Sequence, residues 1–246
     1  TQYCEKYRQW ARVTKATMRI QHKPGDTMEV DWAGATLDIH DPVTGEVSKA
    51  YLFVAVLPCS CFTYAEACDD MKLENWINCH VHAYNYFGGV TRLLVPDNLK
   101  TGIAKNTRSE TILNRTYQEM SEYYNTAIVP ARVRHPRDKS HAEGGVKFAS
   151  TWILAALRNR KLFSMEEARA AVEEKLEELN DRSFRKRPGS RREAYLAEEK
   201  EFMRPVPGEP YEPAIWSPDL KVGNDYLVSD GLNKYSVPYD LIGEKV

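Results

Sequence analysis

The sequence has little that would mark a membrane protein or a strongly charged nucleic-acid binder. No apolar run reaches the roughly 18 residues that a membrane-spanning helix needs, and no signal peptide opens the chain. Its 34 Lys and Arg residues are balanced by 35 Asp and Glu residues, so net charge alone does not indicate nucleic-acid binding. The chain lacks an initiator Met and begins within an expected helix. We therefore expect part of a longer protein, with no membrane association.

Cysteine motifs of the zinc-finger type are also missing. The five cysteines are Cys4, Cys59, Cys61, Cys68 and Cys79. The closest pair is Cys59 and Cys61, with His80 and His82 nearby, but zinc fingers need C-x₂₋₄-C and H-x₃₋₅-H spacings. Neither spacing is met here. We therefore predict buried free thiols in a reducing compartment.

What is present is ordinary for a globular protein, apart from the placement of its charges. Hydrophobic residues make up 42% of the chain and charged residues 28%, which is enough for a core without disulfides. Two basic blocks, 132–139 and 182–192, flank an acidic stretch at 166–178. Such blocks are usually solvated faces. Two basic blocks around an acidic helix are also compatible with a local phosphate-binding track.

Apolar patterning predicts an α/β fold, with a mixed five-stranded sheet that has helices on its faces. Apolar runs predict strands at 27–40, 47–57, 62–68, 90–95 and 127–131. Helical periodicity predicts helices at 1–20, 72–87, 109–124, 138–160, 164–179 and 190–202. Ser-x-x-Glu capping boxes open the last two helices. Short turns between the first three strands imply an antiparallel meander.

Changes in composition divide the chain into five parts. The stretch 205–218 holds five prolines and predicts an extended linker. The stretch 222–237 predicts a hairpin that is too short to bury a core alone. We expect a helical lead-in at 1–22, a core at 23–160, a helical extension at 161–204, the linker, and the start of a small β-domain at 219–246.

Three acidic residues stand out by their positions. Asp31 lies inside the first predicted strand, Asp97 directly follows the fourth, and Glu143 opens the helix after the fifth. A charged residue in a strand interior is disfavoured unless it has a partner, and a metal ion is one such partner. Three carboxylates can hold two Mg²⁺ ions, one activating a water or 3′-hydroxyl and one stabilising the leaving oxygen. This arrangement suits phosphodiester hydrolysis and strand transfer.

Each acid also has an ordinary alternative explanation. Asp31 could face solvent on an edge strand, and Asp97 could be a turn residue. Glu143 could pair with Lys139 or Lys147 on an exposed helix face. Taken together, and in this order of elements, the three acids favour the metal site.

Three motifs around these acids resemble a known family. They are Lys-Pro-Gly-Asp-Thr-Met-Glu-Val-Asp-Trp-Ala-Gly at 23–34, Val-Pro-Asp-Asn-Leu-Lys-Thr-Gly at 95–102 and His-Pro-Arg-Asp-Lys-Ser-His-Ala-Glu-Gly-Gly-Val-Lys at 135–147. They resemble the acidic motifs of the integrase-like (DDE) core of IstA-class insertion-sequence transposases. Asn-Asp-Arg at 180–182 and Arg-Pro-Gly-Ser-Arg-Arg-Glu at 187–193 resemble the stretch that follows that core. The linker and hairpin resemble the start of its small C-terminal β-barrel.

The resemblance implies a ribonuclease-H-like fold and a polynucleotidyl transferase that uses Mg²⁺ or Mn²⁺, with two ions expected when DNA is bound. It implies 3′-end cleavage and strand transfer of an insertion element. It makes Asp31, Asp97 and Glu143 the catalytic and metal-binding residues, with Lys147 contacting DNA. Combined with the basic blocks, it gives the DNA-binding candidates Lys139, Lys147, Arg137, Arg185, Lys186 and Arg187.

The same resemblance implies partners and a location. They are double-stranded DNA from element ends and target, a homo-oligomer on DNA and an AAA+ helper ATPase, in the bacterial cytoplasm. One departure is the separation of 46 residues between Asp97 and Glu143, which is longer than usual in retroviral integrases and makes Asp138 a rival third acid. A nuclease of the same fold and a non-catalytic DNA-binding module of a decayed element are the alternative functions.

Overall fold

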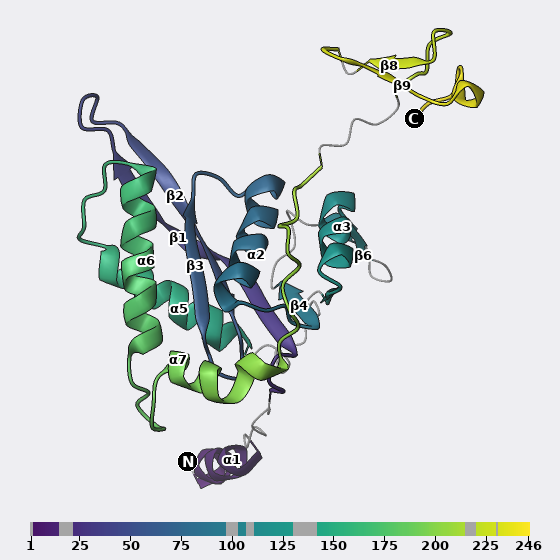
Figure 1. Ribbon diagram of the computed structural model, residues 1–246. Coiled ribbons are helices and arrows are strands. Elements are labelled where there is room, and N and C mark those ends of the chain that lie inside the picture. Colours follow the sequence, from purple (N-terminus) through teal and green to yellow (C-terminus); the bar gives the residue numbers. More distant parts are fainter. Residues whose placement is uncertain are drawn as a thin grey trace. The chain divides into compact units, whose positions relative to one another are not determined.

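The computed structural model describes residues 2–14, 22–96, 103–106, 111–129, 142–214, 220–229 and 231–246 (Figure 1). The chain divides into two units, Thr1–Tyr211 and Glu212–Val246. Helix α1 (Gln2–Thr14) opens the first unit, inside the predicted 1–20. None of the described helices is long and apolar enough to cross a membrane.

A five-stranded mixed sheet forms the centre of the first unit, as predicted. Strands β1 (Thr27–His40), β2 (Val47–Val56) and β3 (Thr63–Cys68) form the antiparallel meander. Strands β4 (Leu93–Pro96) and β7 (Ala127–Ile128) continue the sheet in parallel with β1. The order β3-β2-β1-β4-β7 places β1 in the middle, where it pairs with an antiparallel strand on one side and a parallel strand on the other.

The turn between β1 and β2 follows from its sequence. The Asp41 carboxylate accepts hydrogen bonds from the backbone N–H groups of Val43 and Thr44, at 2.7 and 2.8 Å. Gly45 has a φ of 73°, which glycine adopts without steric cost. The predicted hairpin turn is therefore confirmed.

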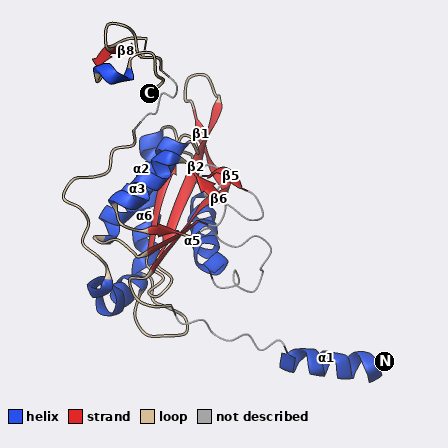
Figure 2. Ribbon diagram, turned by 90° about the vertical axis from the view of Figure 1, so that its right-hand side faces the viewer, coloured by secondary structure: helices blue, strands red, loops and turns tan. Residues whose placement is uncertain are grey.

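Helices cover both faces of the sheet (Figures 1 and 2). Helices α2 (Leu73–Phe87) and α3 (Arg115–Tyr123) pack on one face, and α5 (Ala142–Leu157) and α6 (Met165–Asp181) pack on the other. Strand β2 is buried between the two layers, since its side chains alternate between two separate hydrophobic clusters. Because both faces of β2 are covered, its sequence is a continuous apolar run at 51–57.

Helix α2 buries the face that its periodicity predicts. Trp76, Ile77, His80 and Tyr84 are all buried against the sheet and α3. Gly88 ends the helix in the left-handed conformation, with a φ of 65°.

Two predicted elements begin several residues later than expected, and one hairpin was not predicted. The predicted fourth strand at 90–95 begins only at Leu93, because Val90 pairs through its backbone with Arg204 instead. Helix α3 begins at Arg115 rather than near 109, because the Asn114 side chain caps it by accepting the Thr116 N–H. Residues before Asn114 form a hairpin that was not predicted, with β5 (Ile103–Asn106) paired to β6 (Thr111–Leu113).

Both expected capping serines open helices. Ser164 accepts the Glu167 N–H at the start of α6, but the Glu167 carboxylate bonds to the N–H of Phe163 rather than to that of Ser164. Ser190 and Glu193 form the complete reciprocal box. From there the chain is helical to Phe202, through α7 (Arg191–Ala194), a π-helical turn and a 3₁₀ turn.

The buried carboxylate of Glu199 links the helical segment at 191–202 to the backbone beside β1 and between β2 and β3. Glu199 accepts the Gly25 N–H at 3.2 Å, just before β1, and the Ser60 N–H at 3.0 Å, between β2 and β3. A Cβ on Gly25 would lie 2.5 Å from the Phe202 carbonyl oxygen, so only glycine permits this approach. Gly25, two residues before β1, is therefore fixed both by its hydrogen bond to Glu199 and by its close contact with Phe202.

The second unit contains a short antiparallel hairpin of β8 (Leu227–Ser229) and β9 (Lys234–Ser236). It lies within the predicted hairpin at 222–237.

Candidate active site

Asp31 lies on the central strand and faces the layer formed by α5 and α6. Its neighbours Val30 and Trp32 pack in the cluster on the α2 side, so the alternation of the strand turns Asp31 to the opposite face. Its partner on β2 is Val54, which belongs to the cluster on the α5 side. The side chain is half-buried, and one carboxylate oxygen accepts the Trp32 N–H at 2.9 Å. Asp31 is therefore not a solvent-facing residue of an edge strand.

Strand β4 runs toward Asp97 beside β1. The two strands are parallel, with Val30 opposite Pro96. Asp31 follows Val30, and Asp97 follows Pro96. Asp97 lies outside the described residues, so its position beside Asp31 stays a prediction.

Glu143 belongs to the first turn of α5, and the structure describes the backbone of this residue but not its side chain. Two residues later, Gly145 lies so close to β2 that a Cβ would be 3.3 Å from a methyl carbon of Val56. Val56 and Val54, the partner of Asp31, lie on the same face of β2. Helix α5 therefore begins over the face that carries Asp31. The rival acid, Asp138, lies outside the described residues.

The candidate DNA-binding residues differ in their surroundings. Lys147 on α5 is exposed, and so are Arg185 and Lys186 in the loop between α6 and α7. Arg187 is half-buried, donates to the Ser60 carbonyl oxygen at 3.0 Å and stacks on the Phe184 ring at 3.9 Å. Arg137 and Lys139 lie outside the described residues.

An aromatic contact joins the second basic block to α5. The Arg191 guanidinium lies 5.3 Å from the ring of Phe148 on α5, and 5.3 Å from that of Phe184 in the basic loop. Cations over aromatic rings are attracted electrostatically. This contact brings the basic loop to the helix that carries Lys147.

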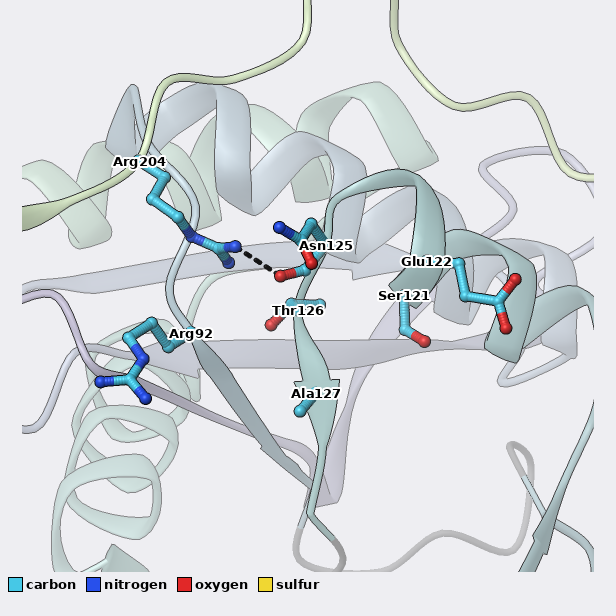
Figure 3. Close-up of a pocket in the computed structure, with 7 residues that line it drawn as sticks. All are labelled: Arg92, Ser121, Glu122, Asn125, Thr126, Ala127 and Arg204. Atoms are coloured by element: carbon cyan, nitrogen blue, oxygen red, sulfur yellow. Dashed lines mark hydrogen bonds between the residues drawn. The ribbon is translucent and has the colours of Figure 1, made fainter.

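A pocket of about 340 Å³ lies elsewhere (Figure 3). It is lined by residues from the end of α3 to the start of β7, with Arg92 and Arg204 at one side. Arg92 precedes β4, whereas Asp97 follows it. The pocket therefore lies at the amino end of β4, away from the predicted site at the carboxyl end.

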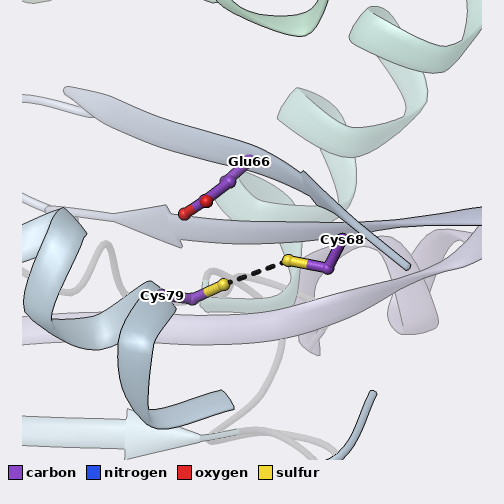
Figure 4. Close-up of side chains that lie close together, drawn as sticks. All are labelled: Glu66, Cys68 and Cys79. Atoms are coloured by element: carbon purple, nitrogen blue, oxygen red, sulfur yellow. Dashed lines mark hydrogen bonds between the residues drawn. The ribbon is translucent and has the colours of Figure 1, made fainter. Parts of the chain in front are cut away.

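A cluster of potential metal ligands was missed by the sequence analysis (Figure 4). Ligand atoms of Glu66, Cys68 and Cys79 all lie within 4.8 Å of one another. The expectation of buried thiols holds for Cys68 and Cys79, whereas the other three cysteines are exposed or half-buried, and all five are free. Two features of the sequence could have indicated this cluster. They are Glu-x-Cys at 66–68 on a strand and Cys-x-x-His at 79–82 on a helix. Neither shows that the strand and the helix pack together.

The Glu66 carboxylate is held by two donors. Its Oε2 atom accepts the Tyr64 hydroxyl at 2.7 Å and lies 2.9 Å from Nδ1 of His82. Burial alone would raise the pKa of Glu66, but the hydrogen bonds from His82 and Tyr64 lower it below its usual value. The same bond to Glu66 raises the pKa of His82.

Comparison with protein families identifies two regions of the chain. Residues 21–136 match the integrase core domain, and residues 206–246 match the Mu transposase C-terminal domain. The first region includes Asp31 and Asp97 and ends before Glu143.

Curated relatives resemble the chain along its whole length. A putative transposase of Sinorhizobium fredii is 42% identical over 99% of this chain and 47% of its own length. Putative transposases for IS1162 of Pseudomonas fluorescens and IS408 of Burkholderia multivorans are each 39% identical over 100% of this chain, and the alignments cover 44% and 47% of these proteins. The chain thus spans about half the length of the curated relatives it matches.

Solved structures share the fold. The simian T-cell lymphotropic virus intasome, in complex with a PP2A regulatory subunit, aligns with a TM-score of 0.55 at 12% identity, over 94% of this chain and 82% of the other. The HTLV-2 integrase catalytic core, in complex with magnesium, aligns with a TM-score of 0.50 at 13% identity, over 72% and 99%. The predicted ribonuclease-H-like fold is confirmed.

Proposed function

Because this chain belongs to the insertion-sequence transposases with an integrase-like core, we propose that it cleaves the 3′ ends of a DNA element and joins them to target DNA in a metal-dependent reaction. Asp31, Asp97 and Glu143 are the proposed catalytic and metal-binding residues. The observation that carries the proposal is the position of Asp31, half-buried on the central strand and facing the layer that α5 opens.

The proposed donor set fits a hard divalent ion. Three carboxylates offer oxygen ligands, which Mg²⁺ and Mn²⁺ prefer, and the HTLV-2 core was solved with magnesium. Two such ions, when bound, lower the pKa of the attacking water or 3′-hydroxyl and stabilise the leaving oxygen.

The chain's own contribution is orientation. The Trp32 N–H fixes one oxygen of Asp31, and the close approach of Gly145 to Val56 fixes the start of α5 over the sheet. Positioning of this kind converts metal binding into an aligned attack on phosphorus.

DNA would be held by basic residues of α5 and of the loop between α6 and α7. Lys147, Arg185 and Lys186 are exposed, and cations of this kind bind phosphates. Arg187 would act mainly by holding the loop, since it already bonds to Ser60. Arg137 and Lys139, close to Glu143 in the sequence, are the remaining candidates.

The proposal extends to partners, location and organisation. We propose binding to double-stranded element ends and target, assembly of a homo-oligomer on DNA, and cooperation with an AAA+ helper ATPase in the bacterial cytoplasm. The integrase-like core would occupy 23–160, the helical extension 161–204, and the β-domain would begin at 219.

A strand-transfer assay tests the proposal. Protein is mixed with labelled element-end DNA, target DNA and Mg²⁺ or Mn²⁺, and the products are sized. We expect joined products with the unchanged protein, and at least about a hundredfold less with Asp31→Asn, Asp97→Asn or Glu143→Gln. Asp38→Asn is the matched control, because Asp38 lies on the same strand but is exposed and paired with Lys49.

Further results of the same assay decide between the functions and between the two candidates for the third acid. The proposal is contradicted if strand transfer continues in excess chelator. It is also contradicted if the Asp97→Asn variant is as active as the unchanged protein. Cut products without joined products indicate a nuclease. Loss of activity in Asp138→Asn but not in Glu143→Gln moves the third acid to Asp138.

A further inference from the structure

The cluster of Glu66, Cys68 and Cys79, with His82 beside Glu66, brings together side chains that can ligate a metal ion. Glu66 and Cys68 are two residues apart on the edge strand and so share its α2-facing side. Cys79 and His82 are three residues apart on α2 and so share one helix face. The Sγ atoms of Cys68 and Cys79 are 3.3 Å apart (Figure 4).

Burial in the cluster is graded from the inside outward. Cys68 and Cys79 are 3% and 1% exposed, whereas the side chains of Glu66 and His82 are 19% and 51% exposed. The two thiols are therefore the buried members of the group, and the carboxylate and the imidazole are its partly exposed members.

We propose that Cys68, Cys79, Glu66 and His82 bind one Zn²⁺ ion. Zinc takes four ligands in a tetrahedron and accepts thiolate, imidazole and carboxylate together. With Zn–S bonds of about 2.3 Å, two thiolates stand about 3.8 Å apart. The observed sulfur atoms need to separate by about 0.5 Å. His82 is not part of the set of ligand atoms within 4.8 Å of one another, so its ring must turn Nδ1 from Glu66 toward the ion.

The carboxylate and imidazole favour an ion over a disulfide. A disulfide needs the two sulfur atoms to close to about 2.05 Å and uses neither Glu66 nor His82. The Tyr64 hydroxyl donates to Oε2 of Glu66, and outer hydrogen bonds of this kind commonly orient the ligands of metal sites.

This site is separate from the proposed catalytic one. It lies on the α2 face of the sheet at its β3 edge, whereas Asp31 faces the α5 layer from the central strand. Its sulfur ligands select softer ions than Mg²⁺. The bound zinc would cross-link β3 to α2.

Metal analysis of the purified protein tests the proposal. After equilibration with zinc and removal of excess, we expect about one zinc per chain. The Cys68→Ser/Cys79→Ser variant should lose it. The Cys59→Ser/Cys61→Ser variant should keep it, and so should Asp97→Asn, which distinguishes this site from the catalytic one. Cobalt in place of zinc should give a thiolate-to-cobalt charge-transfer band.

A milder variant covers the case in which the buried serines prevent folding. His82→Ala removes a partly exposed ligand, and we expect zinc affinity to fall about tenfold or more with an unchanged circular dichroism spectrum. The proposal is overturned if the protein takes up no zinc and shows no cobalt band, whether the thiols are free or joined as a disulfide. It is also overturned if the Cys68→Ser/Cys79→Ser variant retains its zinc.

Discussion

At the scale of single residues, two buried ionisable groups carry measurable consequences. Glu199 is 1% exposed and His80 is fully buried. Burial raises the pKa of Glu199 and lowers the pKa of His80 to about 4, because both charged forms lose their hydration. Glu199 bonds to two backbone N–H groups, and His80 bonds to a backbone carbonyl oxygen and a tyrosine hydroxyl.

Removing Glu199 should destabilise the first unit. Glu199→Ala leaves the Gly25 and Ser60 N–H groups buried without an acceptor, and we expect the free energy of unfolding to fall by about 3 kcal/mol. Glu199→Gln keeps one acceptor and should cost less. Urea unfolding measures both, with Glu198→Ala on the exposed neighbouring position as the control. Equal stability of Glu199→Ala and Glu198→Ala contradicts this role.

His80 should make stability depend on pH. Nδ1 lies 2.6 Å from the Trp76 carbonyl oxygen, to which only an N–H can bond, and Nε2 lies 3.3 Å from the Tyr117 hydroxyl, so in the neutral ring Nδ1 donates and Nε2 accepts. Its folded pKa of about 4 lies below the unfolded value of 6.5. The unfolded chain therefore binds a proton that the folded protein does not. The free energy of unfolding falls by at most about 3 kcal/mol as the pH drops from 6.5 toward 4.

The measurement compares the unchanged protein with His80→Gln, which keeps an amide donor for Trp76. Chemical unfolding is followed between pH 7 and pH 4, and the difference between the two proteins should shrink as the pH falls. Parallel curves would show that His80 does not titrate in this way.

At the scale of elements, the contact between α5 and β2 sets the position of the first turn of α5. A Cβ on Gly145 would lie 3.3 Å from a methyl carbon of Val56, so a side chain there would force Val56 to shift. Gly145→Val should lower the free energy of unfolding by about 2 kcal/mol through overpacking. Val56→Ala removes the methyl groups that the new side chain would meet. The loss of unfolding free energy in the double variant should therefore be about 1 kcal/mol smaller than the sum of the two single losses. Strict additivity in a double-mutant cycle would mean that the two residues do not touch.

Predictability from sequence also differs between elements. The meander was predicted nearly to the residue, because β1 and β2 have clear apolar patterns and Asp41 and Gly45 specify the turn between them. The β5–β6 hairpin was missed because Asn114 was not recognised as the helix cap that separates it from α3.

The same distinction applies to the sites. Asp31 could be placed because an acid in an apolar strand is visible in the sequence. The cluster of Cys68, Cys79 and Glu66 could not, because it depends on a strand and a helix packing together. Local spacing rules describe ligands within one loop or helix, and no such rule links these two elements.

At the scale of the whole molecule, the fold brings three separate stretches of sequence toward one face. Strand β1 is central, β4 lies parallel beside it, and α5 begins above it. Neighbouring parallel strands end at the same edge of a sheet, where sites collect in α/β folds. This topology is the physical basis for expecting Asp31, Asp97 and Glu143 to share metal ions.

A crystal structure of the protein with element-end DNA and Mn²⁺, using the anomalous signal of manganese, tests whether Asp31, Asp97 and Glu143 form one metal centre. We predict manganese bound by the carboxylates of Asp31 and Asp97, with Glu143 completing the site and all three groups within about 8 Å of one another. Manganese bound elsewhere, or no manganese at Asp31 with DNA in place, would contradict the claim that these three acids form the catalytic centre.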